Sequence, residues 1–311
     1  MSSNAPLTLE DQIRLMKNYV VFKNKVKLKK LLSYIGYFRA SRYAKFLLTK
    51  TNNIGSKPTH NMLIDIYYFD VQLRKLLFVY CKYVEIQLKT NISECVLTTG
   101  DQCFYLDDEN YTPSCSEKDA NKRRKNIKFY NTKFFPNLKK QEKELRQNVH
   151  KYPELVQYRK GGEFNTQKIP CWIYFSYVEF GNICMIYKYL SLKYKKKILK
   201  YAHSKTKYSK QEVEQFITWI EAIKNLRNTC CHHNILVGKT SSIVLENSKD
   251  SVLISNTDLF SRLYALKKLL PKDKANDLKK NLKQLLKKIN NEQLEILPLD
   301  WEARFDIICE F

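Results

Sequence analysis

An arginine, an asparagine and a histidine lie close together where a stretch with helical periodicity comes to its end. Asn228 and His232 are four residues apart, which places them on one face of a helix, where the amide could fix the imidazole tautomer. A histidine suits proton transfer because imidazole titrates near neutrality. An arginine suits a phosphate because it is a permanent cation that binds two oxygens, and Arg227 supplies one.

The spacing of the two cationic residues leaves two interpretations open. Arg227 and His232 lie about 140° apart around a helix axis, so one helix does not bring both to one phosphate. Two copies of the helix that cross near a two-fold axis would bring them together. The alternative is a helix that merely ends in cations, which the helix dipole favours at a C-terminus. Short strings of this kind are common.

A helix is predicted to position these residues. Ser209 and Glu212 have the spacing of a capping box, which satisfies two amide donors at a helix start. Gly238 is the first strong stop signal after the motif. Between them, apolar residues recur at steps of three and four and form one stripe: Val213, Phe216, Ile217, Ile220, Ile223 and Leu226.

The string LRNTCCHHNIL at residues 226–236 resembles the corresponding segment of the Abi-like (abortive infection, AbiD/AbiF) proteins, and R-N-x-x-x-H at a helix end is the signature of HEPN ribonucleases. The family often has W-x-x-x-E-x-x-S-F-G. Here Ser176 stands at the glutamate position and Glu179 at the serine position, so the role of that acid does not transfer. Other segments resemble the family in the same order: LTLEDQIRLMKN near the start, then residues 32–43, 66–77, 84–92, 170–181 and 297–301.

This resemblance implies an all-α, HEPN-type helical bundle and an endoribonuclease toxin of an abortive-infection or toxin–antitoxin system against phage. The implied reaction needs no metal or cofactor: the ribose 2′-OH attacks the adjacent phosphate and leaves a 2′,3′-cyclic phosphate. In it His232 is the acid–base group, Arg227 the phosphate clamp and Asn228 the orienter of His232. The implied partners are a target RNA, a small structured non-coding RNA antitoxin and a second copy of the chain. The alternative is a non-catalytic RNA-binding protein that retains the fold.

Composition agrees with a nucleic-acid partner. The net charge is +24, and the default partner of such a field is nucleic acid, although an anionic membrane surface or mere solubility are alternatives. The nine cysteines include no C-x-x-C pair and no secretory signal precedes them, which favours reduced thiols in the cytoplasm. Residues 230–233 are consecutive on a helix and cannot close a tetrahedral metal site. No apolar run reaches the length of about 18 residues that a membrane span needs.

Composition, periodicity and the family resemblance together predict four regions, and the HEPN core among them is what the resemblance implies. Only seven glycines and eight prolines occur, which fits a helical protein. A long helix is expected over residues 62–98, with Arg74 and Glu85 as structural members of its stripe. The predicted regions are an N-terminal helical region at 1–58, a HEPN core at 59–98 and 170–240, an irregular basic insert at 99–169, and a C-terminal helical extension at 241–311.

The insert mixes basic and aromatic residues, a pattern that suits a surface tracking an RNA backbone and stacking on its bases. A solvated helical excursion is the alternative. Near the N-terminus, Arg39 and Arg42 beside aromatic residues could also touch RNA, or each could stack on a neighbouring ring. The candidate RNA contacts of the insert are Lys122, Arg123, Arg124, Lys125, Lys128, Phe129, Tyr130 and Lys133.

Overall fold

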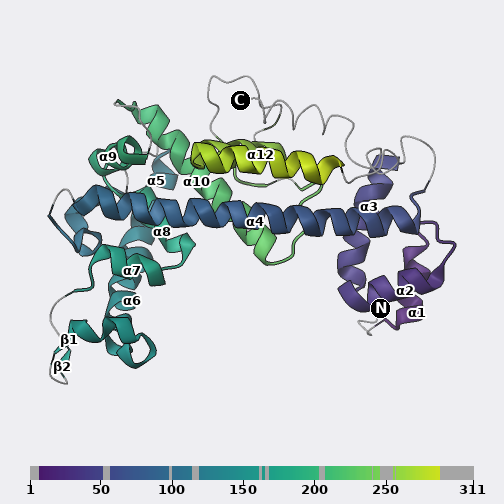
Figure 1. Cartoon of the computed structure of the whole chain (residues 1–311), viewed down its shortest axis with the longest axis horizontal. Helices are drawn as coiled ribbons and strands as arrows, with labels where there is room; N and C mark the ends of the chain where they lie inside the picture. The colour runs from purple at the N-terminus through teal and green to yellow at the C-terminus, as the bar shows by residue number, and fades with distance from the viewer. Residues whose placement is uncertain are drawn as a thin grey trace. The chain divides into compact units, whose positions relative to one another are not determined.

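The computed structural model describes residues 7–51, 57–97, 100–113, 119–160, 163–164, 168–202, 207–239, 241–245, 255 and 257–287 (Figure 1). The secondary-structure elements of this part of the chain are all helices except one short antiparallel strand pair, β1 (Arg159–Lys160) and β2 (Glu163–Phe164). The all-α class predicted from the sequence is therefore confirmed. Among these residues, no helix combines the length and the apolar character needed to cross a membrane.

Two compact units divide the chain, and each is built from separate stretches of sequence. The first comprises Met1–Cys81, Asn225–Val244 and Lys249–Phe311, and the second comprises Lys82–Lys224 and Leu245–Ser248. The boundary cuts through the two longest helices, α4 (His60–Leu97) and α10 (Lys210–Cys231). The four-region division stays a prediction. The family-like segment at 297–301 lies outside the described residues.

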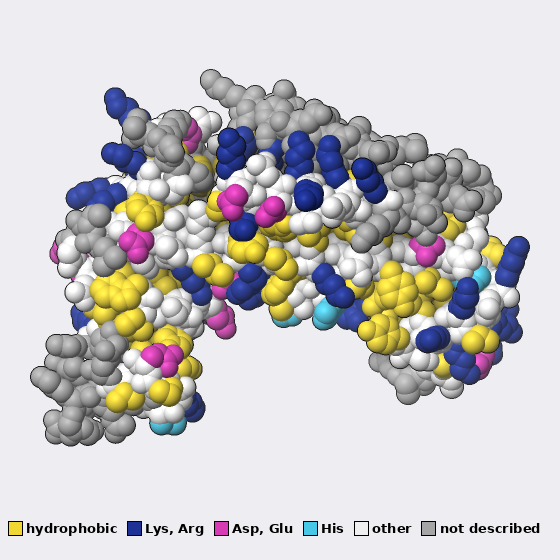
Figure 2. Space-filling view, in the orientation of Figure 1, with side chains coloured by type: hydrophobic (Ala, Val, Ile, Leu, Met, Phe, Trp, Pro, Cys, Tyr) yellow, Lys and Arg dark blue, Asp and Glu magenta, His cyan; other side chains and the backbone are white. Residues whose placement is uncertain are grey.

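The first unit packs short helices around the N-terminal part of α4. Its other helices are α1 (Leu9–Met16), α2 (Lys25–Ile35), α3 (Tyr37–Thr51), α11 (Leu259–Leu269) and α12 (Lys272–Lys287), together with the end of α10. Thr8 caps α1, accepting from the Asp11 amide at 3.2 Å. On α12, Leu278 and Leu282 are buried. Figure 2 shows dark blue lysine side chains along α12, and Lys272, Lys280 and Lys287 are exposed, so the helix buries one face and presents cations on the other.

The second unit holds most of the remaining helices. They are α5 (Ala120–Phe129), a π-helical turn (Tyr130–Phe134), α6 (Phe135–Gln147), α7 (Cys171–Tyr177), α8 (Phe180–Tyr189) and α9 (Leu192–Ala202), with short 3₁₀ turns at Phe104–Leu106, Asp108–Asn110, Val149–Lys151 and Pro153–Tyr158. Val178 and Leu190 adopt extended backbone angles, and they separate α7 from α8 and α8 from α9.

Aromatic residues form much of the core of the second unit. Tyr105 and Tyr174 are stacked with ring centroids 4.5 Å apart, and Tyr130 stacks on Phe135 at 5.4 Å. Tyr130 is only 2% exposed, and its hydroxyl donates to Oδ1 of Asp108 at 2.6 Å. A ring held in this way cannot stack on a base, so the prediction that Tyr130 contacts RNA is wrong. Its place among lysines reflects a helix with one buried face.

Candidate functional site

The motif helix α10 begins where the sequence predicts. The Ser209 amide donates to Oε2 of Glu212 at 2.8 Å, and the Glu212 amide donates to Oγ of Ser209 at 3.2 Å. This reciprocal pair is the capping box, and it fixes the start of the helix. The helix then runs to Cys231, so Arg227 and Asn228 lie in its last turn and His232 follows directly after it.

The end of α10 differs from the predicted stop. The His233 amide donates to the Cys230 carbonyl at 3.4 Å, and the Asn234 amide donates to the Thr229 carbonyl at 3.0 Å. These two bonds form a Schellman motif, whose left-handed residue is usually glycine. Here it is His233, with φ of +53°. Gly238, the predicted stop, has φ of +70° and lies where a Cβ would overlap the Phe46 ring.

The motif side chains lie at the surface of the first unit. Asn228 and His232 are exposed, as is Cys231 between them, whereas Arg227 is partly buried. Nη1 of Arg227 donates to Oδ1 of Asn228 at 3.2 Å. Within the described residues no side-chain hydrogen bond joins Asn228 to His232, so Asn228 serves as an acceptor for the arginine. That Asn228 orients the imidazole stays a prediction.

A buried carboxylate anchors the segment that follows the motif. Oδ1 of Asp70, on α4, accepts hydrogen bonds from the Leu236 amide at 2.9 Å and the Val237 amide at 3.0 Å. Oδ2 of Asp70 accepts from the Tyr43 hydroxyl at 2.6 Å and from Nη1 of Arg74. One side chain of α4 therefore holds α3 and the backbone just after the motif in a single polar network.

Arg74 links the Asp70 carboxylate to the backbone after the motif. Nη1 of Arg74 also donates to the Asn234 carbonyl at 3.2 Å, and Asp70 and Arg74 are 0% and 4% exposed. Burial raises the pKa of Asp70, while the Arg74 charge and the hydrogen bonds oppose that rise. Arg74 is thus structural, as expected. Sequence reasoning missed Asp70 and Tyr43, and the available signal was the spacing of Asp70 and Arg74, four residues apart on a predicted helix.

Further cations gather beside the end of α10. Nζ of Lys239 donates to Oγ1 of Thr229 at 2.9 Å, and burial, together with the positive charges of Arg42 and Arg262, lowers the pKa of Lys239. Arg42 is exposed, and its guanidinium lies 5.9 Å from the centroid of the Phe38 ring. The arginine therefore does stack on its neighbour, as one interpretation held, and it also adds to the positive field near the motif.

The other predicted RNA contacts are distributed over both units. Arg39 is partly buried on α3. The cations of the insert, all exposed, lie on α5 and in the turn after it, in the unit that does not contain the motif: Lys122, Arg123, Arg124, Lys125, Lys128 and Lys133. Phe129 is 42% exposed. Across the part of the chain that the structure describes, no three His, Cys, Asp or Glu side chains are arranged to hold a metal ion.

Comparison with known proteins gives one family. A family model described as Abi-like protein matches residues 30–237, which is more than half of the chain and includes the whole of α10 and the anchored segment after it. No curated protein and no solved structure gives a significant match.

Proposed function

Because the chain belongs to the Abi-like family, whose description points to abortive infection, we propose that it is a HEPN-type endoribonuclease toxin of such a system. The observation that carries the proposal is the exposed His232 and Asn228 beside Arg227 at a helix end. Asn228 and His232 are not needed to fill the core, and the buried Asp70 network anchors the backbone that follows them.

In the proposed reaction the ribose 2′-OH attacks the adjacent phosphorus. The 2′-O–P bond forms as the P–O5′ bond breaks, a base takes the 2′-OH proton, and an acid protonates the departing 5′-oxygen. His232 serves as one of these proton-transfer groups. Arg227 binds the phosphate oxygens, on which negative charge grows in the transition state. Lys239, which contacts Thr229 of α10, and the neighbouring Arg42 add positive potential near the motif.

A homodimer would bring an arginine and a histidine to the same phosphate, which the helix of one copy does not do. The chain carries one motif, and Arg227 and His232 of that motif lie about 140° apart around the helix axis. Two α10 ends crossing at a two-fold axis place Arg227 of one copy beside the partner's His232 and bring two histidines to one phosphate. Exposure of Asn228, Cys231 and His232 leaves this surface open to a second copy.

Crosslinking at Cys231 tests the dimer. If the two α10 ends meet, the exposed Cys231 thiols of the two copies lie close together, and a short bismaleimide should yield a covalent dimer. Cys231→Ser should remove this product, while Cys103→Ser, at a partly buried thiol of the other unit, should leave it unchanged. A 37.0 kDa monomer in light scattering, both free and with RNA, would contradict the dimer.

The chemistry of the product tests the proposed function. Purified protein incubated with single-stranded RNA in EDTA should produce fragments ending in 2′,3′-cyclic phosphate, because every proton-transfer and charge-stabilising group in the proposal is a side chain. Enzymatic removal of cyclic phosphates followed by mass spectrometry identifies these ends. RNA that is bound but stays intact with and without divalent cations would instead support the non-catalytic RNA-binding protein.

A small structured non-coding RNA is the proposed partner that holds the toxin inactive. The net charge of +24 far exceeds what one scissile phosphate requires. Exposed cations occur on α5, α9 and α12 as well as near the motif, so they suit an RNA held over many phosphates.

A further inference from the structure

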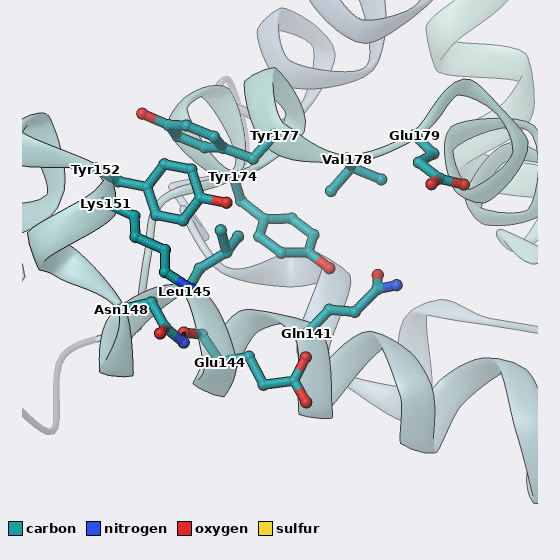
Figure 3. A pocket seen from close by; sticks show the side chains of 10 residues that line it. All are labelled: Gln141, Glu144, Leu145, Asn148, Lys151, Tyr152, Tyr174, Tyr177, Val178 and Glu179. Atoms are coloured by element: carbon teal, nitrogen blue, oxygen red, sulfur yellow. Dashed lines mark hydrogen bonds between the residues drawn. The ribbon is translucent and has the colours of Figure 1, made fainter.

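A pocket of about 280 Å³ opens in the second unit between α6, the turns that follow it, and α7 (Figure 3). Tyr174 and Val178 are the buried members of its lining. Tyr152 and Tyr177 are partly exposed. The volume is near the lower limit of the range of about 300–1,000 Å³ found for small-molecule sites, which suits one planar ring.

Its aromatic wall is held in place from behind. Tyr152 and Tyr177 meet edge to face with ring centroids 4.8 Å apart, and Figure 3 shows the pair on one side of the Tyr174 ring. The Tyr174 hydroxyl donates to the Leu138 carbonyl at 3.3 Å, and its ring stacks on Tyr105. Because these contacts order the rings before any ligand binds, little conformational entropy is lost when a ring enters.

The polar groups of the pocket favour a ligand that donates hydrogen bonds. Glu144 and Glu179 are exposed at the rim, and the Gln141 carbonyl oxygen is oriented by Nδ2 of Asn182 at 3.1 Å. One lysine, Lys151, joins them. Two carboxylates disfavour a phosphate inside the pocket, whereas they accept readily from the amino group of a base.

The cations that RNA needs lie just outside. Lys140 is exposed on α6 and pairs with Glu144 at 3.6 Å, and Lys143 is exposed on the next turn. Cations that can follow phosphates thus lie beside a pocket that can take a base. The pocket also gives a role to the segment that departs from the family pattern W-x-x-x-E-x-x-S-F-G. Glu179, at the serine position, lines the pocket, whereas Ser176, at the glutamate position, donates to the Trp172 carbonyl of its own helix at 3.3 Å.

We propose that this pocket holds one unpaired nucleobase of bound RNA, selected for an exocyclic amino group, with Tyr152 and Tyr177 against the ring and Glu179 accepting from the amino group. The proposal rests on the proposed function only in taking RNA as the ligand. It concerns binding in the second unit, and the cleavage motif belongs to the first.

Equilibrium binding tests the pocket. The probes are a short fluorescent oligouridylate and the same oligomer with one internal cytidine, both measured with the His232→Ala protein so that no cleavage intervenes. We expect the cytidine probe to bind at least about fivefold more tightly, and Glu179→Ala to remove that preference. Tyr177→Ala should weaken binding of the cytidine probe roughly 5- to 150-fold because the stacking is lost. Tyr201→Ala, at an exposed tyrosine of α9, is the matched control and should change neither.

The outcomes separate the two proposals. If Glu179→Ala and Tyr177→Ala bind both probes as the parent protein does, the pocket assignment is wrong, even when the wild-type protein cleaves RNA. If the preference for cytidine depends on Glu179 while the wild-type protein cleaves nothing, the pocket stands and the ribonuclease proposal fails. Glu179 is exposed and its side chain makes no capping hydrogen bond to α8, so its substitution leaves the fold intact. That variant therefore decides the question even if Tyr177→Ala is unstable.

Discussion

We expect His232→Ala to lower the rate of RNA cleavage by about 10²–10⁴-fold, the usual cost of removing a general acid or base. Arg227→Ala should lower it by about 10²–10³-fold, because charge on the phosphate oxygens then lacks its main stabilising group. Both side chains lie at or near the surface of the helix end, so neither change creates a core cavity. Single-turnover cleavage by purified protein gives the rates, and growth of cells expressing each variant gives the matching toxicity.

His150→Ala is the matched control, since His150 is exposed in the unit that does not contain the motif. It should cleave RNA at the wild-type rate. Circular dichroism should show the same helix content for all variants. If the double variant of Arg227 and His232 still cleaves RNA at the wild-type rate, the assignment of the site is wrong.

Asp70→Asn should lower the free energy of unfolding by about 3–5 kcal/mol, the usual cost of breaking a buried ion pair by removing one partner. The change leaves the Arg74 guanidinium buried without its counter-charge, with the side chain only 5% exposed. Urea denaturation measures the loss. The matched control is Glu10→Gln, which removes an ion pair to Lys29 whose side chains are 67% and 55% exposed. It should cost less than about 1 kcal/mol.

The same substitution should also slow RNA cleavage, although Asp70 has no place in the chemistry. Its carboxylate holds the Leu236 and Val237 amides, and through them the segment that follows His232. Under conditions where Asp70→Asn remains folded, the motif would then be less well positioned. An unfolding free energy within about 1 kcal/mol of wild type would show that the network does not stabilise the fold as argued.

A local signal in the sequence predicted the start of α10 correctly. Thr8 and the Ser209–Glu212 pair cap their helices because a cap depends on residues only two or three positions apart. The stop of α10 could not be predicted in the same way. The left-handed position is occupied by His233, and a histidine carries a much weaker signal for that conformation than a glycine does.

The periodicity of the sequence could not predict contacts between segments that are far apart in the chain. Periodicity placed Arg227 and His232 at a helix end, but it could not show that Lys239 and Arg42 lie nearby. It also could not distinguish the buried Tyr130 from the exposed Phe129 beside it. Both rings follow a run of basic residues, and only the contacts of Tyr130 with Asp108, Tyr111 and Tyr189 decide which of them faces the core.

The hydrogen bonds of Asp70 have a consequence for the order in which the protein matures. Its two amide partners lie 166 and 167 residues further along the chain. A ribosome adding about 5–20 residues per second needs on the order of ten seconds to supply them. During that interval Arg74, one helical turn away, can neutralise the carboxylate alone. The helix end that carries Arg227 and His232 docks only afterwards, so a nascent chain exposes its basic surface well before it can assemble the motif.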